Sequence, residues 1–252
     1  MINQYHRPHT LEETLKLLSH PDARPLGGGT VLTQKSEESF SVVDLQALGL
    51  DMLHQSSNNL EIGAATKLQT LLESPFIGKA LKNAITLETP LNLRNMGTVA
   101  GTLVTCDGRS PFGTVMLALD AKLWLATQDG TLAINLGDLL PLKNEFLRGK
   151  LITKIEIPLK IKIAFETVAR TPADKPIVCA ALAQWASGRT RLTVGGWGPA
   201  PVLAMDGNEP GGLQEAARNA TSDASDEWAS AEYRMETVRI LVKRCQDALF
   251  SI

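Results

Sequence analysis

The sequence predicts an α+β protein, with a two-lobed N-terminal domain and a C-terminal domain that combines a three-stranded antiparallel sheet with helices. Three observations favour this class. The 252 residues are too many for one small core and suit two domains. Helix-spaced and strand-spaced apolar segments are interspersed over residues 1–160. From about residue 161 the pattern changes to a meander of strands and then to helices. We therefore expect one domain at 1–160, with lobes at about 1–55 and 56–160, and a second at 161–252.

The composition argues against several classes of protein. Hydrophobic residues make up 44% of the chain and charged residues 21%, which is typical of a globular protein. The net charge of -2 disfavours a nucleic-acid-binding surface, which is usually basic. No apolar run approaches the roughly 20 residues of a membrane span, and the first residues lack an apolar signal region. We expect a cytoplasmic protein that has no membrane span and binds no nucleic acid.

The first helix is predicted by a capping pattern. Thr10 precedes an apolar stripe and Glu13 follows three residues later, so we expect a helix that begins near Leu11 and ends near His20. A polar break at 55–59 separates two strands. The other elements expected in this domain are strands at 40–45, 60–63, 122–127, 131–134 and 151–158, and helices at 67–72, 76–86 and 112–119.

The C-terminal domain is predicted to end in a long amphipathic helix at about 230–250. One face of this helix is apolar, and Arg234, Arg239 and Lys243 are expected on a solvated face. The apolar stripe consists of Val238, Leu241, Val242, Cys245 and Leu249. The earlier elements are strands at 163–169, 177–185 and 190–195, a bend at 195–199 and a helix at about 209–219.

Two segments rich in glycine and threonine, residues 26–32 and 94–103, are candidates for a ligand site. Glycine accepts positive φ and lets a ligand approach the backbone, so consecutive N–H groups can surround one anion. Two such loops could hold one diphosphate from both sides. The alternative is that Gly27 to Gly29 form only a flexible turn. Neither segment has the spacing and lysine of a P-loop, and the first does not open a helix as a Rossmann fingerprint does.

The reactive side chains form no catalytic or metal-binding pattern. Cys106, Cys179 and Cys245 are too widely spaced for a CxxC metal-binding motif, and their odd number prevents a complete disulfide framework. An iron–sulfur cluster normally takes four cysteines. The four histidines lack the HExxH pattern. We therefore expect no catalytic residue, no metal site and no cluster bound by this chain alone.

Three separated motifs, in this order, resemble the FAD-binding medium subunit of the molybdenum hydroxylases, the family of xanthine dehydrogenase and carbon monoxide dehydrogenase. The first covers residues 7–32, the second covers 94–103 and the Ala-Leu-Asp-Ala segment at 118–121, and the third is Ala-Ser-Ala-Glu-Tyr-Arg at 229–234. Together they span nearly the whole chain. The resemblance implies a two-lobed FAD-binding domain of the PCMH type, followed by a C-terminal domain like that of the carbon monoxide dehydrogenase flavoprotein.

The resemblance also implies how FAD would bind. Backbone amides of both segments and the hydroxyls of Thr30 and Thr98 would surround the diphosphate through charge-assisted hydrogen bonds. Ile152 would pack near the isoalloxazine, and Asp107 matches a polar position of the family. The full set of implied cofactor-binding residues is Leu26, Gly27, Gly28, Gly29, Thr30, Val31, Leu32, Thr98, Ala100, Gly101, Thr102, Asp107 and Ile152.

The role implied by the resemblance is electron transfer within a complex. The partners would be a 2Fe–2S small subunit and a molybdopterin-binding large subunit, and the acceptor would be NAD, a quinone or oxygen. Arg109 would either stabilise a reduced flavin or make a surface or subunit contact. A stand-alone flavin oxidase is disfavoured because the chain shows no evident substrate domain.

Some residues depart from the family pattern and suggest an alternative. Ala100 stands where the family has glycine. If this position needs a positive φ, alanine there costs on the order of 1 kcal/mol. Val31 and Thr102 replace residues with other hydrogen-bonding groups, and Pro111 stands where many members have an acid near the flavin. The alternative function is therefore a scaffold subunit that has lost its affinity for FAD.

Overall fold

The computed structural model describes residues 1–35, 37–208 and 211–250. These residues form two compact units, each assembled from separate stretches of the chain. The first unit comprises the described residues of 1–74, 91–105 and 122–157, and the second those of 75–90, 106–121 and 158–250. The expected division into domains at residue 160 stays a prediction. No helix in the described part of the chain is long and apolar enough to cross a membrane.

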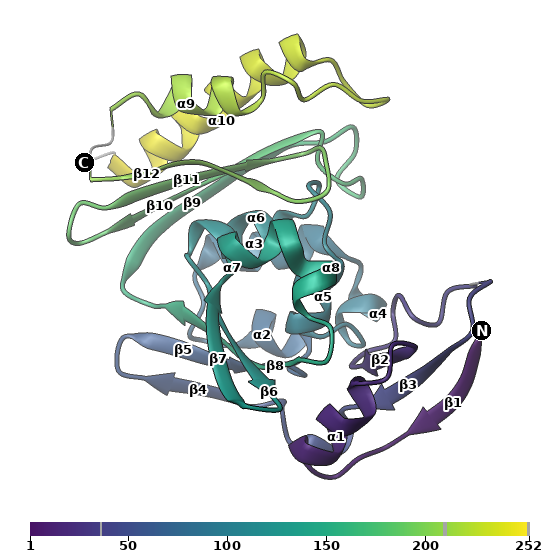
Figure 1. Ribbon diagram of the computed structural model, residues 1–252. Coiled ribbons are helices and arrows are strands. Elements are labelled where there is room, and N and C mark those ends of the chain that lie inside the picture. Colours follow the sequence, from purple (N-terminus) through teal and green to yellow (C-terminus); the bar gives the residue numbers. More distant parts are fainter. Residues whose placement is uncertain (36, 209–210, 251–252) are drawn as a thin grey trace. The chain divides into compact units, whose positions relative to one another are not determined.

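The first unit begins with a small parallel sheet. Strands β1 (Ile2–His6) and β2 (Ala23–Leu26) both pair in parallel with β3 (Phe40–Asp44), which lies between them (Figure 1). All five residues of β3 are buried. Helix α1 (Leu11–Leu18) begins at the predicted cap, where the Thr10 side chain accepts a hydrogen bond from Glu13 N at 3.2 Å. Since parallel strands end at one edge, the segment that follows β2 starts beside the end of β3.

A five-stranded sheet completes the first unit in the order β4-β5-β8-β6-β7. Its strands are β4 (Leu53–Ser56), β5 (Asn59–Gly63), β6 (Lys122–Thr127), β7 (Gly130–Asn135) and β8 (Leu151–Pro158). The strands predicted on either side of 55–59 and of 128–130 pair as two antiparallel hairpins. The helical segments of this unit are η1 (Gln46–Leu48), α2 (Leu68–Glu73), α4 (Leu91–Arg94), α5 (Val99–Thr105), α7 (Leu136–Leu139), η2 (Leu140–Leu142) and α8 (Lys143–Phe146).

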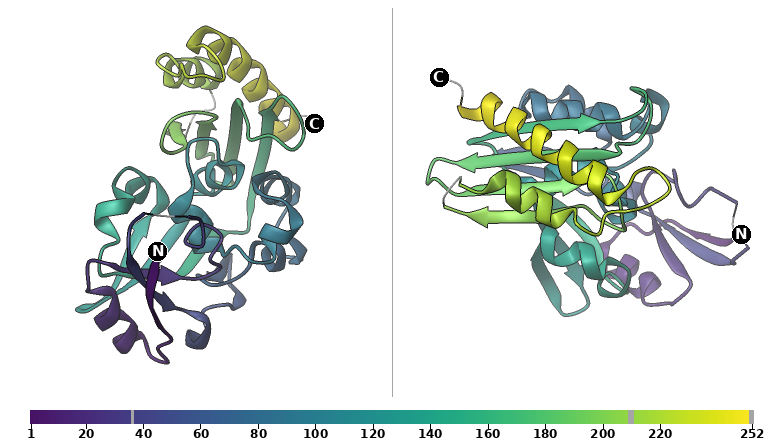
Figure 2. Two further views of the ribbon diagram at one scale, coloured as in Figure 1. Left: turned by 90° about the vertical axis from the view of Figure 1, so that its right-hand side faces the viewer. Right: turned by 90° about the horizontal axis from the view of Figure 1, so that it is seen from above.

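The second unit is a four-stranded antiparallel sheet with helices on both faces. The predicted meander is confirmed, and a fourth strand extends it, in the order β12-β11-β10-β9. Figures 1 and 2 show one pair of helices on each face, with α3 and α6 opposite α9 and α10. The strands are β9 (Ile161–Val168), β10 (Val178–Trp185), β11 (Thr190–Gly195) and β12 (Val202–Gly207). The helices are α3 (Lys79–Glu88), α6 (Pro111–Ala118), α9 (Leu213–Ala220) and α10 (Ala231–Phe250).

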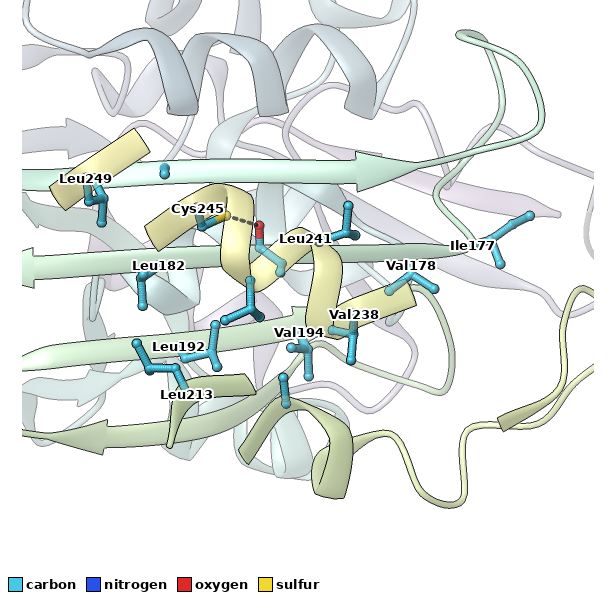
Figure 3. Close-up of a cluster of buried hydrophobic side chains, with 14 residues drawn as sticks. Ile177, Val178, Leu182, Leu192, Val194, Leu213, Val238, Leu241, Cys245 and Leu249 are labelled. Atoms are coloured by element: carbon cyan, nitrogen blue, oxygen red, sulfur yellow. Dashed lines mark hydrogen bonds between the residues drawn. The ribbon is translucent and has the colours of Figure 1, made fainter. Parts of the chain in front are cut away.

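The stripe predicted on the last helix forms the core between α10 and the sheet (Figure 3). Val238, Leu241 and Val242 are at most 1% exposed and pack with residues of β10 and β11. The Cys245 thiol lies 3.7 Å from Ala180 O, to which it donates a weak hydrogen bond. Burial raises the pKa of Cys245 to about 12, so this thiol is an inert core group at neutral pH. Of the helix expected at 209–219, the part from Leu213 is confirmed, and residues 209–210 lie outside the described residues.

The expectation that Arg234 faces solvent is wrong, because its side chain is fully buried. Its Nε donates to Ile177 O at 3.1 Å, and its Nη1 donates to Ala224 O and to Ala229 O. Its Nη2 forms an ion pair with Asp226 at 2.7 Å. One guanidinium therefore satisfies several backbone carbonyls from segments that have no regular structure of their own. This role explains the arginine of the third motif.

We predict that Arg234→Met lowers the free energy of unfolding by about 3 kcal/mol, because the buried carbonyls lose their donor. Arg239→Met is the matched control on the same helix, since Arg239 is 39% exposed and its ion pairs are 3.4 Å or longer. It should change stability by about 0.5 kcal/mol or less. Urea unfolding of both variants measures the difference, and equal effects would contradict the assignment.

Candidate functional site

The first glycine-rich segment leaves the carboxyl edge of the parallel sheet. Leu26, the last residue of β2, lies opposite Asp44, the last residue of β3. Gly29 has a φ of +71°, which a residue with a side chain rarely adopts. Thr33 N donates to Gly29 O at 3.1 Å, so the chain turns back immediately after the glycines. The crevice outside the carboxyl ends of parallel strands is where open α/β sheets commonly bind ligands.

The second segment is a turn followed by a helix, and the expectation of a continuous loop from 94 to 103 is wrong. Helix α4 ends at Arg94, and α5 begins at Val99. Ala100 is therefore helical, and its φ is not positive. The strain considered for alanine at this position does not arise, since a right-handed helix accepts alanine better than glycine.

The two segments lie directly against each other, as expected. A Cβ on Gly28 would lie 2.0 Å from Met96 O, and a Cβ on Gly27 would lie 2.9 Å from the hydroxyl oxygen of Thr98. Backbone atoms of the first segment thus contact the turn of the second at a distance that only glycine permits. Residues that are about 70 positions apart in the sequence form one continuous surface.

We call the place where residues 26–32 meet residues 94–103 the junction. The backbone N–H groups there differ in whether they have an acceptor within the chain. Within the described residues, the N–H groups of 28–32 and of Thr98 have no acceptor. In contrast, the N–H groups that begin α5 are all bonded: Val99 to Thr66 O at 2.8 Å, Ala100 to Ala64 O at 3.2 Å, Gly101 to Thr98 Oγ1 at 3.1 Å and Thr102 to Thr98 O at 2.9 Å. These four N–H groups therefore already have acceptors within the chain, and their binding to the diphosphate stays a prediction.

The first segment and Thr98 nevertheless fit an anionic ligand. Thr98 Oγ1 accepts the bond from Gly101 N, and its hydroxyl hydrogen remains available to donate. Thr102 cannot help in the same way, because its hydroxyl already donates to Thr98 O at 2.9 Å. Five consecutive backbone donors without protein acceptors, next to a threonine hydroxyl, match the needs of a phosphate group.

Lys67 is a charged residue at this junction that the sequence analysis missed. Its Nζ donates to Met96 O at 3.0 Å, which is the same oxygen that Gly28 faces. The backbone of Lys67 lies opposite Thr98 in an isolated antiparallel bridge. Burial lowers the pKa of Lys67, and the charges of Asp44 and Asp51 partly oppose this shift. A single lysine outside any motif carries no sequence signal of such a position.

Asp44 is a buried carboxylate at the same edge of the sheet. Its Oδ1 accepts a hydrogen bond from Gln46 N at 2.9 Å, and its Oδ2 accepts one from the Tyr5 hydroxyl. The bond to Asp44 raises the pKa of Tyr5. This carboxylate therefore caps the end of β3 and has its oxygens occupied, so it is a structural group of the site.

Two other predicted residues are placed by the structure without a test of their role. Ile152 is buried in β8, opposite Leu125 of β6. Asp107 belongs to the second unit, where it forms an ion pair with Lys175 at 2.7 Å and accepts a bond from Arg109 N at 2.9 Å. Their contacts with FAD stay predictions.

The segment 106–110 makes several contacts within the second unit through Gly108 and Arg109. Arg109 donates to Pro176 O at 2.9 Å and to Lys175 O at 2.8 Å, and its guanidinium lies 4.4 Å from the ring centre of Trp228. Gly108 exchanges backbone hydrogen bonds with Gly196 and Gly198. The contacts of Arg109 are thus made within this chain.

Pro111 begins α6, and an acid from another helix lies beside it. Glu88 accepts hydrogen bonds from the Ser110 hydroxyl at 2.7 Å and from Phe112 N at 3.0 Å. Burial raises the pKa of Glu88, although both hydrogen bonds oppose this shift.

Within the described residues no cluster of three or more His, Cys, Asp or Glu could hold a metal ion.

Comparisons with known proteins agree with the resemblance in the sequence. Residues 1–160 match the family model described as the FAD binding domain in molybdopterin dehydrogenase. The chain is 27% identical to the glyceraldehyde dehydrogenase medium chain of Sulfolobus acidocaldarius, covering 95% of each chain. It is 26% identical to the 6-hydroxypseudooxynicotine dehydrogenase complex subunit alpha of Paenarthrobacter nicotinovorans, covering 93% of this chain and 90% of that one.

The fold is also similar to that of a solved structure. A chain of the reconstituted CO dehydrogenase from Oligotropha carboxidovorans superposes with a TM-score of 0.83 at 24% identity. The match covers 98% of this chain and 96% of that chain. This likeness confirms the α+β fold class predicted from the sequence.

We predict that Gly28→Ala lowers the free energy of unfolding by about 1–3 kcal/mol and weakens FAD binding, because the new methyl group overlaps Met96 O and separates the two segments. Gly78→Ala is a matched control, since a Cβ there meets nothing within 4 Å and the φ of Gly78 is -82°. Thermal unfolding and FAD titration measure both effects. Normal FAD affinity in Gly28→Ala would show that the contact does not shape the site.

We predict that Ala100→Gly leaves the affinity for FAD unchanged and lowers the free energy of unfolding by about 0.5–1 kcal/mol, because the residue is helical. Fluorescence titration of the apoprotein with FAD measures the first quantity, and urea unfolding measures the second. A marked gain in affinity would instead indicate that alanine impairs the site.

Proposed function

The chain belongs to the family of FAD-binding domains of molybdopterin dehydrogenases, and from this premise we propose that it is the FAD-binding electron-transfer subunit of a multi-subunit molybdenum hydroxylase. The observation that carries the proposal is the junction of the two segments. Five backbone N–H groups without acceptors in the described residues, the Thr98 hydroxyl and the Lys67 ammonium lie around it. Together they suit the diphosphate of a dinucleotide.

Each part of the chain has a distinct task in this proposal. The N–H groups of 28–32 bind the diphosphate, and Gly28 permits the close approach of the two segments. Thr98 adds a donor from the second segment. When bound, FAD supplies the redox chemistry, accepting electrons from the iron–sulfur clusters of a partner and passing them to NAD, a quinone or oxygen. The protein supplies binding and orientation, so no acid, base or nucleophile is required.

The partners we propose are a 2Fe–2S small subunit and a molybdopterin-binding large subunit. The chain has three cysteines, all of them buried, whereas a cluster normally takes four. Two relatives, a dehydrogenase medium chain and a subunit of a dehydrogenase complex, also support a multi-subunit assembly. The cytoplasmic location and the identity of the acceptor stay predictions.

The scaffold alternative has lost part of its support. It rested on Ala100, Thr102 and Pro111, and Ala100 is compatible with its helical position. The Thr102 hydroxyl donates to Thr98 O, and Pro111 takes the first position of α6, where proline is favoured. These substitutions are therefore explained by the helices that contain them.

We predict that the purified protein is yellow or becomes yellow when incubated with FAD, with the absorption spectrum of a bound flavin. Gel filtration separates protein-bound flavin from free flavin. Heat release and chromatography of the bound cofactor then identify it as FAD. Protein that stays colourless after incubation with FAD would contradict the proposal.

The partners are tested by affinity purification of the full chain from its native host, with mass spectrometry and metal analysis of the material that co-purifies. We expect an iron–sulfur protein and a molybdenum-containing protein in comparable amounts. Flavin-loaded chain that co-purifies with neither iron nor molybdenum would restrict the proposal to FAD binding alone.

A further inference from the structure

We propose that Lys67 is the cationic ligand of the diphosphate, the charged group that complements the backbone donors of the first segment. This inference rests on the proposed FAD site and deepens it. Lys67 lies between β5 and α2, outside both glycine- and threonine-rich segments, and its role follows from its contacts. In the described part of the chain, its ammonium donates a hydrogen bond to Met96 O at 3.0 Å.

The position of the ammonium is fixed by the turn that Gly28 contacts. Met96 O accepts from Lys67 Nζ and also faces Gly28, so the charge lies next to the first segment. The backbone next to Lys67 reinforces this placement, since Leu68 N donates to Gly97 O at 3.0 Å. The lysine is therefore held in place before any ligand binds.

The ammonium has capacity left for a ligand. It has three N–H donors, of which one is used on Met96 O. Lys67 forms no ion pair within the residues that the structure describes, although it is partly buried. Asp44, an acid at the sheet edge, accepts hydrogen bonds from the Tyr5 hydroxyl and from Gln46 N. A half-buried cation without a paired carboxylate suits an anionic ligand.

Charge explains why such a residue is needed. The chain as a whole carries a net charge of -2, and Asp44 and Asp51 both act electrostatically on Lys67. The field near the segment is therefore unfavourable to a diphosphate unless a local cation offsets it. Neutral backbone N–H groups provide direction, and Lys67 provides the opposite charge.

The test compares three substitutions in the full-length apoprotein. Lys67→Gln keeps a donor for Met96 O and loses the charge, Lys67→Arg keeps the charge, and Lys16→Met removes an exposed lysine of α1 as a control. We expect Lys67→Gln to weaken FAD binding about 10- to 100-fold. Lys67→Arg should recover most of the affinity, and Lys16→Met should match the unmodified chain.

A second probe separates the diphosphate from the flavin ring. ADP contains the diphosphate without the isoalloxazine, so Lys67→Gln should weaken ADP and FAD by similar factors. Equal affinities of Lys67→Gln and the unmodified chain would overturn the inference. It would also be overturned if Lys67→Arg lost as much affinity as Lys67→Gln, or if only FAD and not ADP were affected. Failure of the unmodified chain to bind FAD would contradict the proposed function instead.

Discussion

The contact between the Gly28 backbone and the carbonyl oxygen of Met96 is the constraint on which the candidate site depends. It brings the end of the parallel sheet against the turn that precedes α5, at a separation that leaves no space for a Cβ. The same oxygen holds the Lys67 ammonium, and the neighbouring Thr98 side chain packs on Gly27. Backbone donors, a hydroxyl and a cation are therefore gathered by one close approach of two distant segments.

The sequence indicated that the two segments meet, which the structure shows, but it did not reveal that the second segment contains the start of a helix. Glycines that follow a strand are recognisable because their conformational freedom is local, and α1 is recognisable because its cap lies within four residues. The helix that begins at Val99 could not be predicted from Val-Ala-Gly-Thr, whose helix propensity is low. Its first N–H groups are satisfied by carbonyls of residues 64 and 66, far away in the sequence. Lys67 was missed for a similar reason, because its hydrogen bond to Met96 O joins residues 29 positions apart.

Edge strands and buried charges were the other features that local patterns did not predict. Strand β1 is mostly polar and exposed, and it exists because it pairs with the buried β3. Strand β12 likewise lies at an edge, where alternation is weak. Arg234 was assigned to the solvated face because it is charged, although it lies four residues before Val238 and therefore on the same side of the helix as the apolar stripe. The carbonyls of Ile177, Ala224 and Ala229 surround its guanidinium there. Such partners become visible only when the chain is folded.

Amide hydrogen exchange, measured with and without FAD, tests the central claim most directly. We expect the N–H groups of 28–32, which have no acceptor in the described structure, to become strongly protected when FAD is added. The N–H groups of 99–102 are already bonded and should change little. Protection that appears elsewhere while 28–32 continue to exchange freely would contradict the account.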